Sequence, residues 1–188
     1  MAIETPQYEV LDKNGRIELR RYNGYITASV VIKANSYNSA ANKAFRTLAD
    51  YIFGNNTKQT KIAMTAPVVS QKPITSEKIA MTAPVTASKL NSQTYVISFS
   101  MPSSYSMDDL PLPNNKGVSI KKTPTHEAVV IRFSGYTTEA KIEKMTKKLK
   151  EWASQKQLNL YSEPTVLRYD PPWKPGFIRR NEVSFSVI

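Results

Sequence analysis

The two halves of this chain repeat one pattern when one half is shifted along the other by 101 residues. The shift pairs Ile17 with Val118 and Leu48 with Leu149, and no gap is needed from the strand through the helix. Near the end of each half the word Ser-Phe-Ser recurs at a smaller shift. A chain that repeats its own pattern is constrained to build two equivalent halves, so we expect a pseudo-two-fold axis.

These repeats predict the fold class. Each is expected to be a β-β-α-β-β unit, over about residues 7–101 and 117–188 of a single domain, residues 1–188. The strand segments mostly alternate apolar and polar residues, and hairpins join most of them, which favours antiparallel pairing. Helices with one apolar stripe are expected at about residues 36–53 and 138–157. We predict an α+β fold: a curved, mostly antiparallel sheet or distorted eight-stranded barrel, flanked by two helices, with a ligand cleft at the pseudo-dyad.

An eight-residue word, Lys-Ile-Ala-Met-Thr-Ala-Pro-Val, occurs twice, at Lys61–Val68 and at Lys78–Val85. Its proline excludes the interior of a packed helix, and its alternation of residue types is typical of a half-buried strand. Each copy is therefore predicted as a strand. A local duplication, with one copy in the sheet and the other in an insertion, is the alternative.

The residue types exclude several kinds of chemistry. The absence of cysteine excludes disulfides, thiolate catalysis and iron–sulfur clusters. A single histidine, His126, excludes a tetrahedral zinc site of histidine and cysteine ligands. No nucleophile elbow, Gly-rich phosphate loop or EF-hand pattern occurs, so we expect neither an enzyme nor a metal site. His126 is either a base or ligand or, more simply, a solvated turn residue.

The charge of the chain bears on its partners. Lys and Arg number 26 against 15 Asp and Glu, which gives a formal net charge of +11. Such an excess favours nucleic acid, acidic lipid surfaces or small anionic ligands, although a generally basic surface explains it equally well. The lysines of the second predicted helix fit a solvated helix face better than a nucleic-acid footprint. No signal peptide or membrane span is visible, so a cytoplasmic location is expected.

A run rich in proline and glycine near the C-terminus places aromatic residues beside cations. Trp173 and Phe177 are bracketed by Lys174, Arg179 and Arg180. Rigid aromatic rings next to cations suit a flat apolar ligand with anionic edges. The alternative is a structural hairpin whose aromatic side chains fold back onto the core.

Taken together, these motifs resemble the SOUL haem-binding protein family. The resemblance spans about residues 7–188 and is carried by Tyr8–Val10, Ile17–Tyr22, both copies of the eight-residue word, Tyr105–Asn114 before Val118, and Arg168–Val183. It implies a distorted antiparallel barrel of two pseudo-repeats with two helices, the fold of GyrI-like effector-binding domains. It also implies non-covalent binding of haem or related tetrapyrroles in a shallow apolar groove, near the first helix and the C-terminal hairpin.

The resemblance also indicates which residues would contact the ligand. Two apolar positions on the first helix and one basic position in the C-terminal run match the groove of the family. With the two aromatic residues of that run, the predicted site consists of Phe45, Leu48, Trp173, Lys174 and Phe177. Arg21 stands where some members have a histidine considered as an axial ligand, so ligation of the iron by the protein is implied to be absent or weak.

Three functions follow from these observations. The leading hypothesis is a carrier or buffer of a tetrapyrrole, with haem as a non-covalent cofactor. The second is an effector-binding or protein-interaction module that uses the same cleft for another planar or amphipathic ligand. Association with nucleic acid through the lysine-rich helix is the third, and it has the weakest support in the sequence.

Overall fold

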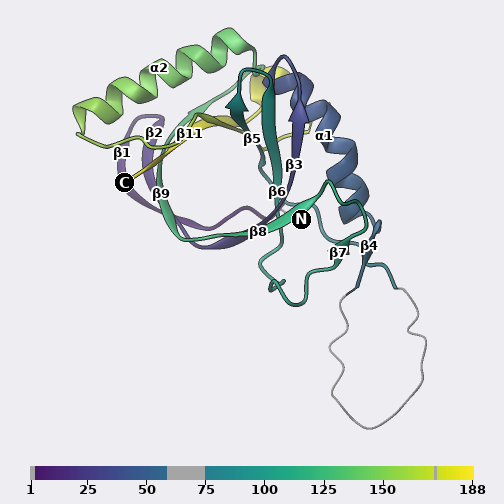
Figure 1. Cartoon of the computed structure of the whole chain (residues 1–188). Helices are drawn as coiled ribbons and strands as arrows, with labels where there is room; N and C mark the ends of the chain where they lie inside the picture. The colour runs from purple at the N-terminus through teal and green to yellow at the C-terminus, as the bar shows by residue number, and fades with distance from the viewer. Residues whose placement is uncertain (1–2, 59–74, 172) are drawn as a thin grey trace, which may run out of the picture.

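Nine strands form one curled sheet, and two helices lie on its outside (Figure 1). The computed structural model describes residues 3–58, 75–171 and 173–188. The sheet contains β1 (Tyr8–Asn14), β2 (Ile17–Tyr22), β3 (Tyr25–Lys33), β5 (Val85–Asn91), β6 (Thr94–Ser100), β8 (Ser119–Thr123), β9 (His126–Phe133), β10 (Thr165–Arg168) and β11 (Asn181–Val187). All neighbours in the order β1-β2-β9-β11-β10-β5-β6-β3-β8 are antiparallel. The short strands β4 (Asn56–Thr57) and β7 (Leu112–Pro113) pair with each other.

The two helices, α1 (Tyr37–Ile52) and α2 (Glu139–Gln155), each cover one half of the sheet. The side chains of Ser36 and Thr138 cap them, each accepting a backbone N–H three residues further on. Helix α1 packs against β3, β5 and β6, whereas α2 packs against β9 and β11. Both helices lie on the outer face of the curled sheet (Figure 1), and their apolar stripes are buried there.

The strand order is symmetric about the boundary between β10 and β5. Outward from this boundary, β10, β11, β9 and β2 on one side correspond to β5, β6, β3 and β8 on the other. A shift of 101 residues carries β2 onto β8, β3 onto β9 and most of α1 onto α2. The predicted fold class is confirmed, and β1 is a ninth strand because it pairs with β2 at the edge of the sheet.

The two faces of the sheet differ in chemistry because successive strand residues point to opposite faces. On the face under the helices, Val129 and Ile131 of β9 belong to the main apolar core. Their neighbour Val130 points to the concave face, where it belongs to a smaller cluster with Tyr22. This second face also buries a charged residue, Glu182. Because a buried charge needs polar partners, the concave face must contain the groups that bind the Glu182 carboxylate.

The second copy of the repeated word is not a strand over most of its length. Strand β5 begins at Val85, and residues 78–84 have no strand assignment. The backbone N–H groups of Ile79 and Ala83 donate to carbonyls at the end of α1 and in the N-terminal segment, each at 2.8 Å. The strand prediction is wrong here because the backbone N–H groups of this segment donate to these carbonyls and do not pair with a neighbouring strand. The first copy, residues 61–68, lies outside the described residues.

Candidate ligand-binding site

The connection between β10 and β11, residues 169–180, carries three of the five predicted site residues. Its ends lie side by side because Arg168 pairs with Asn181 across the two strands. At the base of the loop the Tyr169 N–H donates to the Arg180 carbonyl at 3.2 Å. The sheet thus holds both ends of this loop.

A buried carboxylate fixes the base of the loop further. Glu182 is 0% exposed, and its oxygens accept hydrogen bonds from Arg20 at 2.8 and 3.1 Å. They also accept from the Tyr169 hydroxyl at 2.8 Å and from Arg180 at 2.7 Å. Burial alone would raise the pKa of Glu182, but the two guanidinium groups outweigh it and lower that pKa. The first and last residues of the loop are therefore tied to one buried charge.

A second carboxylate ties the middle of the loop to its end. Asp170 accepts hydrogen bonds from Lys174 Nζ and from the Arg180 backbone N–H, each at 2.6 Å. Burial opposes the charge of Asp170, but these two donors outweigh it and lower the pKa of the carboxyl. The ammonium group of Lys174, predicted as a cation of the site, already has a carboxylate partner within the loop.

The two predicted aromatic residues project from the loop. Trp173 is 83% exposed and Phe177 is 78% exposed, so neither ring folds back onto the core. Tyr136, before α2, packs against the same loop: a Cβ placed on Gly176 would lie 2.5 Å from its ring. The Arg179 guanidinium lies 5.1 Å from the centroid of the Tyr136 ring. Sequence reasoning missed Tyr136 because no pattern along the chain brings it to this loop.

The two predicted residues of α1 differ in accessibility. Phe45 is 44% exposed, and its ring centroid lies 5.8 Å from that of Phe99 on β6. Leu48 is 0% exposed and belongs to the main core. A ligand on the surface can contact Phe45 directly, whereas Leu48 would support the ligand only through its neighbours.

A row of paired residues joins the position of Phe45 to the loop. Phe99 pairs with Val85 on β5, and Val85 pairs with Arg168 on β10. Paired side chains share one face, and neighbouring strands lie about 4.8 Å apart, so about 10 Å separates Phe99 from Arg168. Phe45 and the loop therefore border the same strip of the outer face.

Arg168 closes this strip at the base of the loop. Its guanidinium donates to Asn38 Oδ1 on α1 at 2.7 Å. Its Nε is buried and has no hydrogen-bond partner among the described residues. Burial lowers the pKa of Arg168 and Glu139 opposes that shift, but an arginine stays protonated. A half-buried guanidinium with an unused N–H can donate a hydrogen bond to a carboxylate.

A cleft of about 520 Å³ opens beside the loop, towards β2 and β9. Of the five predicted site residues, only Phe177 lines it. Its charged lining consists of Lys13, Arg16, Arg132, Arg179, Arg180 and a single carboxylate, Glu18. This cleft, which we call the basic cleft, therefore has an excess of positive charge.

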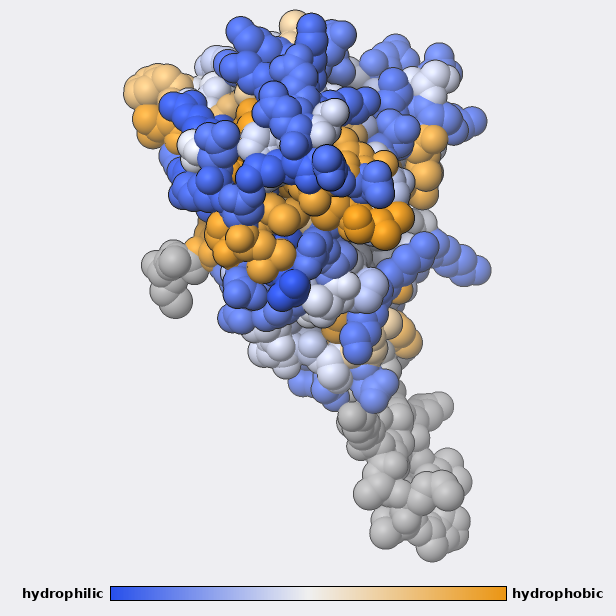
Figure 2. Space-filling view, turned by 90° about the vertical axis from the view of Figure 1, so that its left-hand side faces the viewer, coloured by the Kyte–Doolittle hydropathy of each residue, from blue (hydrophilic) through white to orange (hydrophobic). Residues whose placement is uncertain are grey.

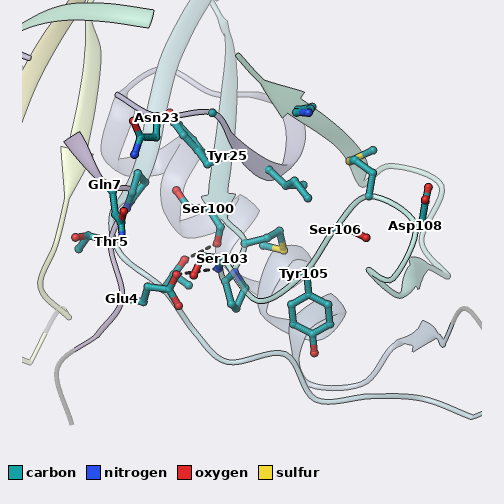
Figure 3. Close-up of a pocket in the computed structure, with 18 residues that line it drawn as sticks. Glu4, Thr5, Gln7, Asn23, Tyr25, Ser100, Ser103, Tyr105, Ser106 and Asp108 are labelled. Carbon is teal, nitrogen blue, oxygen red and sulfur yellow. Dashed lines mark hydrogen bonds between the residues drawn. The ribbon is translucent and has the colours of Figure 1, made fainter. Parts of the chain in front are cut away.

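A second cavity, of about 440 Å³, lies where the N-terminal segment crosses the ends of β3 and β6. Figure 3 shows polar side chains from three segments around it, among them Gln7, Asn23 and Tyr25. The Ser103 N–H donates to Glu4 Oε1 at 2.8 Å and fixes one wall. None of the predicted site residues lines this cavity.

His126 lies far from the loop. It begins β9, whereas Phe133 at the other end of β9 pairs with Asn181 beside the loop. Seven residues of strand separate the two ends by about 24 Å. The His126 ring stacks on Tyr22 with centroids 5.3 Å apart, and its Nδ1 lies 3.0 Å from the Pro124 carbonyl. Within the described ranges no group of three or more potential metal ligands occurs.

Helix α2 presents its lysines on the outside of the molecule. Lys144, Lys147 and Lys148 are exposed, and Glu143 and Glu151 lie among them. Figure 2 shows this side with hydrophilic surface above and a band of apolar surface across the middle. The mixed charge fits a solvated helix face. In the part of the chain that is described, no helix is long and apolar enough to cross a bilayer.

The curled sheet with two outer helices is the GyrI-like effector-binding fold, shared with solved structures. The EcmrR C-terminal domain matches with a TM-score of 0.64 and 12% identity, over 96% of this chain and 98% of that domain. A hydrolase from Listeria innocua matches with a TM-score of 0.57 and 12% identity, over 95% and 94% of the two chains. At such identities the likeness shows the fold alone.

The sequence gives the narrower assignment: the chain belongs to the SOUL heme-binding protein family, which matches residues 3–186. Heme-binding protein 1 of Xenopus tropicalis is 29% identical over 176 residues, covering 93% of this chain and 85% of that protein. Heme-binding protein 2 of Homo sapiens is 28% identical over 144 residues, covering 74% of this chain and 64% of that protein. The resemblance seen in the motifs is therefore confirmed.

Proposed function

We propose that this chain, as a single domain over residues 1–188, binds haem or a related tetrapyrrole non-covalently. In this role it carries or buffers the ligand and does not transform it. The observation that carries the proposal is the exposed pair Trp173 and Phe177, held on a loop that buried Glu182 anchors. Membership of the SOUL heme-binding protein family supports the same ligand class.

The residues around the loop fit two parts of a tetrapyrrole. The exposed rings of Trp173, Phe177 and Phe45 offer apolar faces for a flat macrocycle. Arg168, with its unused buried N–H, fits a carboxylate edge. Lys174 can serve the same edge if a ligand carboxylate replaces Asp170 as its partner. We propose Phe45, Trp173, Lys174 and Phe177 as contacts, with Leu48 supporting them from the core.

The side chains near the loop are less suited to ligate an iron atom than to contact the macrocycle. His126, the one histidine of the sequence, starts a strand whose far end lies about 24 Å away, beside the loop. The sequence has no cysteine to offer a thiolate. We therefore propose that the chain recognises the macrocycle and its carboxylates, and that neither histidine nor cysteine ligates the iron.

Absorbance titrations with hemin and with metal-free protoporphyrin test this proposal. Similar affinity for both is expected, because aromatic and carboxylate contacts are common to the two. A much tighter hemin complex would mean that a side chain ligates the iron. If neither compound changes its absorbance with protein at tens of micromolar, the chain is not a tetrapyrrole carrier.

The cavity in Figure 3 supports a second candidate, a module that binds another amphipathic ligand. Its volume of about 440 Å³ lies within the range of small-molecule sites, and its lining mixes polar groups with Met101 and Met107. A thermal-shift screen with aromatic cations and anions tests it, because a ligand stabilises the state that it binds. A hit that Tyr25→Ala abolishes and Phe177→Ser preserves would favour this function over tetrapyrrole binding.

A further inference from the structure

The basic cleft contains two arginines whose charge no carboxylate neutralises within the described residues. Arg16 and Arg132 lie directly opposite each other, because the Arg132 N–H donates to the Arg16 carbonyl at 2.9 Å and Ile17 pairs with Ile131. The Cβ atoms of such a pair lie about 5 Å apart on one face. Like charges at this spacing destabilise a sheet, and an anion between them would reverse that effect.

The nearby carboxylates are already engaged. Glu182 is directly opposite Arg132 in the sheet, but its oxygens accept hydrogen bonds from three other side chains. Glu18 pairs with Lys13 at 3.1 Å and with Arg20 at 2.8 Å. Burial alone would raise the pKa of Glu18, but these two cations outweigh it and lower that pKa. The positive charge of Arg16 and Arg132 is thus left for an external anion.

The cleft combines this charge with an apolar wall. Phe133, Phe177 and Ile178 line it beside the arginines. Arg180 is held in place, since its guanidinium pairs with Glu182 and lies 3.9 Å from the centroid of the Tyr169 ring. Fixed cations next to exposed apolar side chains suit a ligand with a charged end and an organic part.

We propose that the basic cleft, which shares Phe177 with the proposed tetrapyrrole site, is a second binding site for a small molecule with two linked phosphate groups. Guanidinium groups bind phosphate oxygens in pairs, which makes adjacent arginines a phosphate site. The charges of Arg16 and Arg132, which no carboxylate of the described residues neutralises, match a ligand with more than one negative charge. The volume of about 520 Å³ lies within the range of small-molecule sites, whereas a nucleic-acid strand needs a groove that tracks its backbone.

Isothermal titration with inorganic pyrophosphate at low ionic strength tests the site in the full chain. Arg16→Gln and Arg132→Gln each remove one charge from an exposed side chain. Each is expected to weaken pyrophosphate binding about tenfold or more, as the loss of a hydrogen bond to a charged group implies. Lys148→Gln on α2 is the matched control, because it removes the same charge away from the cleft, and it should change the affinity less than twofold.

A conservative variant separates geometry from charge. Arg132→Lys keeps the charge but loses the planar fork, so its affinity should lie between those of the wild type and Arg132→Gln. Far-UV circular dichroism and Tm establish that each variant is folded. An Arg132→Lys variant as tight as the wild type would overturn the paired-guanidinium geometry.

Four further outcomes would overturn the proposal. The first is no pyrophosphate binding by the wild type. The second is an equal loss in Lys148→Gln, which would mean non-specific attraction. The third is competition between hemin and pyrophosphate, which would make the cleft part of the tetrapyrrole site. The fourth is tighter binding of malonate or of a single-stranded oligonucleotide, lost in the same variants, which would assign the cleft to another ligand class.

Discussion

Two equivalent hairpins of this molecule differ in the loop that closes them. Strands β5 and β6 are joined by residues 92–93, whereas β10 and β11, their counterparts across the pseudo-two-fold, are joined by residues 169–180. The short turn carries none of the predicted site residues. The long loop carries three of them. A repeated scaffold can acquire a binding site through a change in one loop, because loops vary more freely than the strands that hold them.

The buried charges follow the same asymmetry. Under the shift that aligns the two Ser-Phe-Ser words, Glu182 corresponds to Val96 in the first half of the sequence. The shift of 101 residues places Arg20 opposite Lys121, which is exposed. Of these positions, only those on the side of the sheet formed by β2, β9, β11 and β10, which carries the long loop, have a buried ion pair. We infer that the pair Arg20–Glu182 serves the loop rather than the sheet common to both halves.

The largest expected difference between the two hairpins is in stability, after substitution of Glu182 and of its counterpart Val96. Glu182→Ala removes the buried carboxylate that both Arg20 and Arg180 contact, which is expected to reduce the free energy of unfolding by about 3–5 kcal/mol. Val96→Ala removes only half-buried apolar surface, so a loss of about 1 kcal/mol or less is expected. Urea unfolding at pH 7 measures both. Equal losses would mean that the carboxylate has no special role in the second half.

The two loops should also differ in ligand binding. Replacing both Trp173 and Phe177 by Ser is expected to weaken hemin binding about 100-fold or more, since burying each large apolar side chain contributes about 1.5–3 kcal/mol. Leu90→Ser, an exposed apolar residue beside the short turn, is the matched control and should leave the affinity unchanged. Absorbance titration with hemin gives both values. A control as damaging as the double variant would show binding to exposed apolar surface in general.

The ion pair between Asp170 and Lys174 within the long loop is expected to have a smaller effect. Asp170→Asn removes the ion pair with Lys174 and should reduce the free energy of unfolding by about 1 kcal/mol or less at pH 7, in line with a partly exposed pair. Because the pKa of Asp170 in the folded state lies below its ordinary value of 3.8, its stabilising effect is present above that pH. The effect is lost as the pH falls through the folded-state pKa.

Thermal unfolding against pH checks the sign of this effect. Below about pH 4 the Tm of the wild type should fall towards that of Asp170→Asn, and at pH 7 the wild type should have the higher Tm. Asp50→Asn on α1, at a carboxylate that accepts a hydrogen bond from Asn55 Nδ2, serves as the control. A difference between wild type and Asp170→Asn that grows towards acid would contradict the lowered pKa.

More of the fold than of the candidate site could be predicted from the sequence. The repeat at a shift of 101 residues and the helical stripes depend on local pattern, which survives folding. The second Met-Thr-Ala-Pro word failed as a strand because Ile79 and Ala83 find backbone partners from distant segments. Leu48 was placed in the site by family resemblance, but the same apolar character buries it in the core.

The basic cleft could not be predicted at all. Arg16 and Arg132 are far apart in the sequence, and only the pairing of β2 with β9 across the two repeats brings them together. The orphaned Nε of Arg168 likewise depends on the packing of α1 above it. The proximity of Trp173 and Phe177 could be predicted from the sequence, because a proline-rich loop keeps neighbouring residues together in space.

The smallest effect is expected at Arg21, where some family members have a histidine. Arg21 pairs with Glu127 near the start of β9, and six residues of strand place it about 20 Å from the end of β9 beside the long loop. Arg21→His should therefore leave hemin affinity within twofold and produce no shift of the Soret band, while stability changes by about 1 kcal/mol or less. A Soret shift in this variant would place the iron beside β2. The tetrapyrrole would then lie away from Trp173 and Phe177, and the asymmetry of the two hairpins would need another explanation.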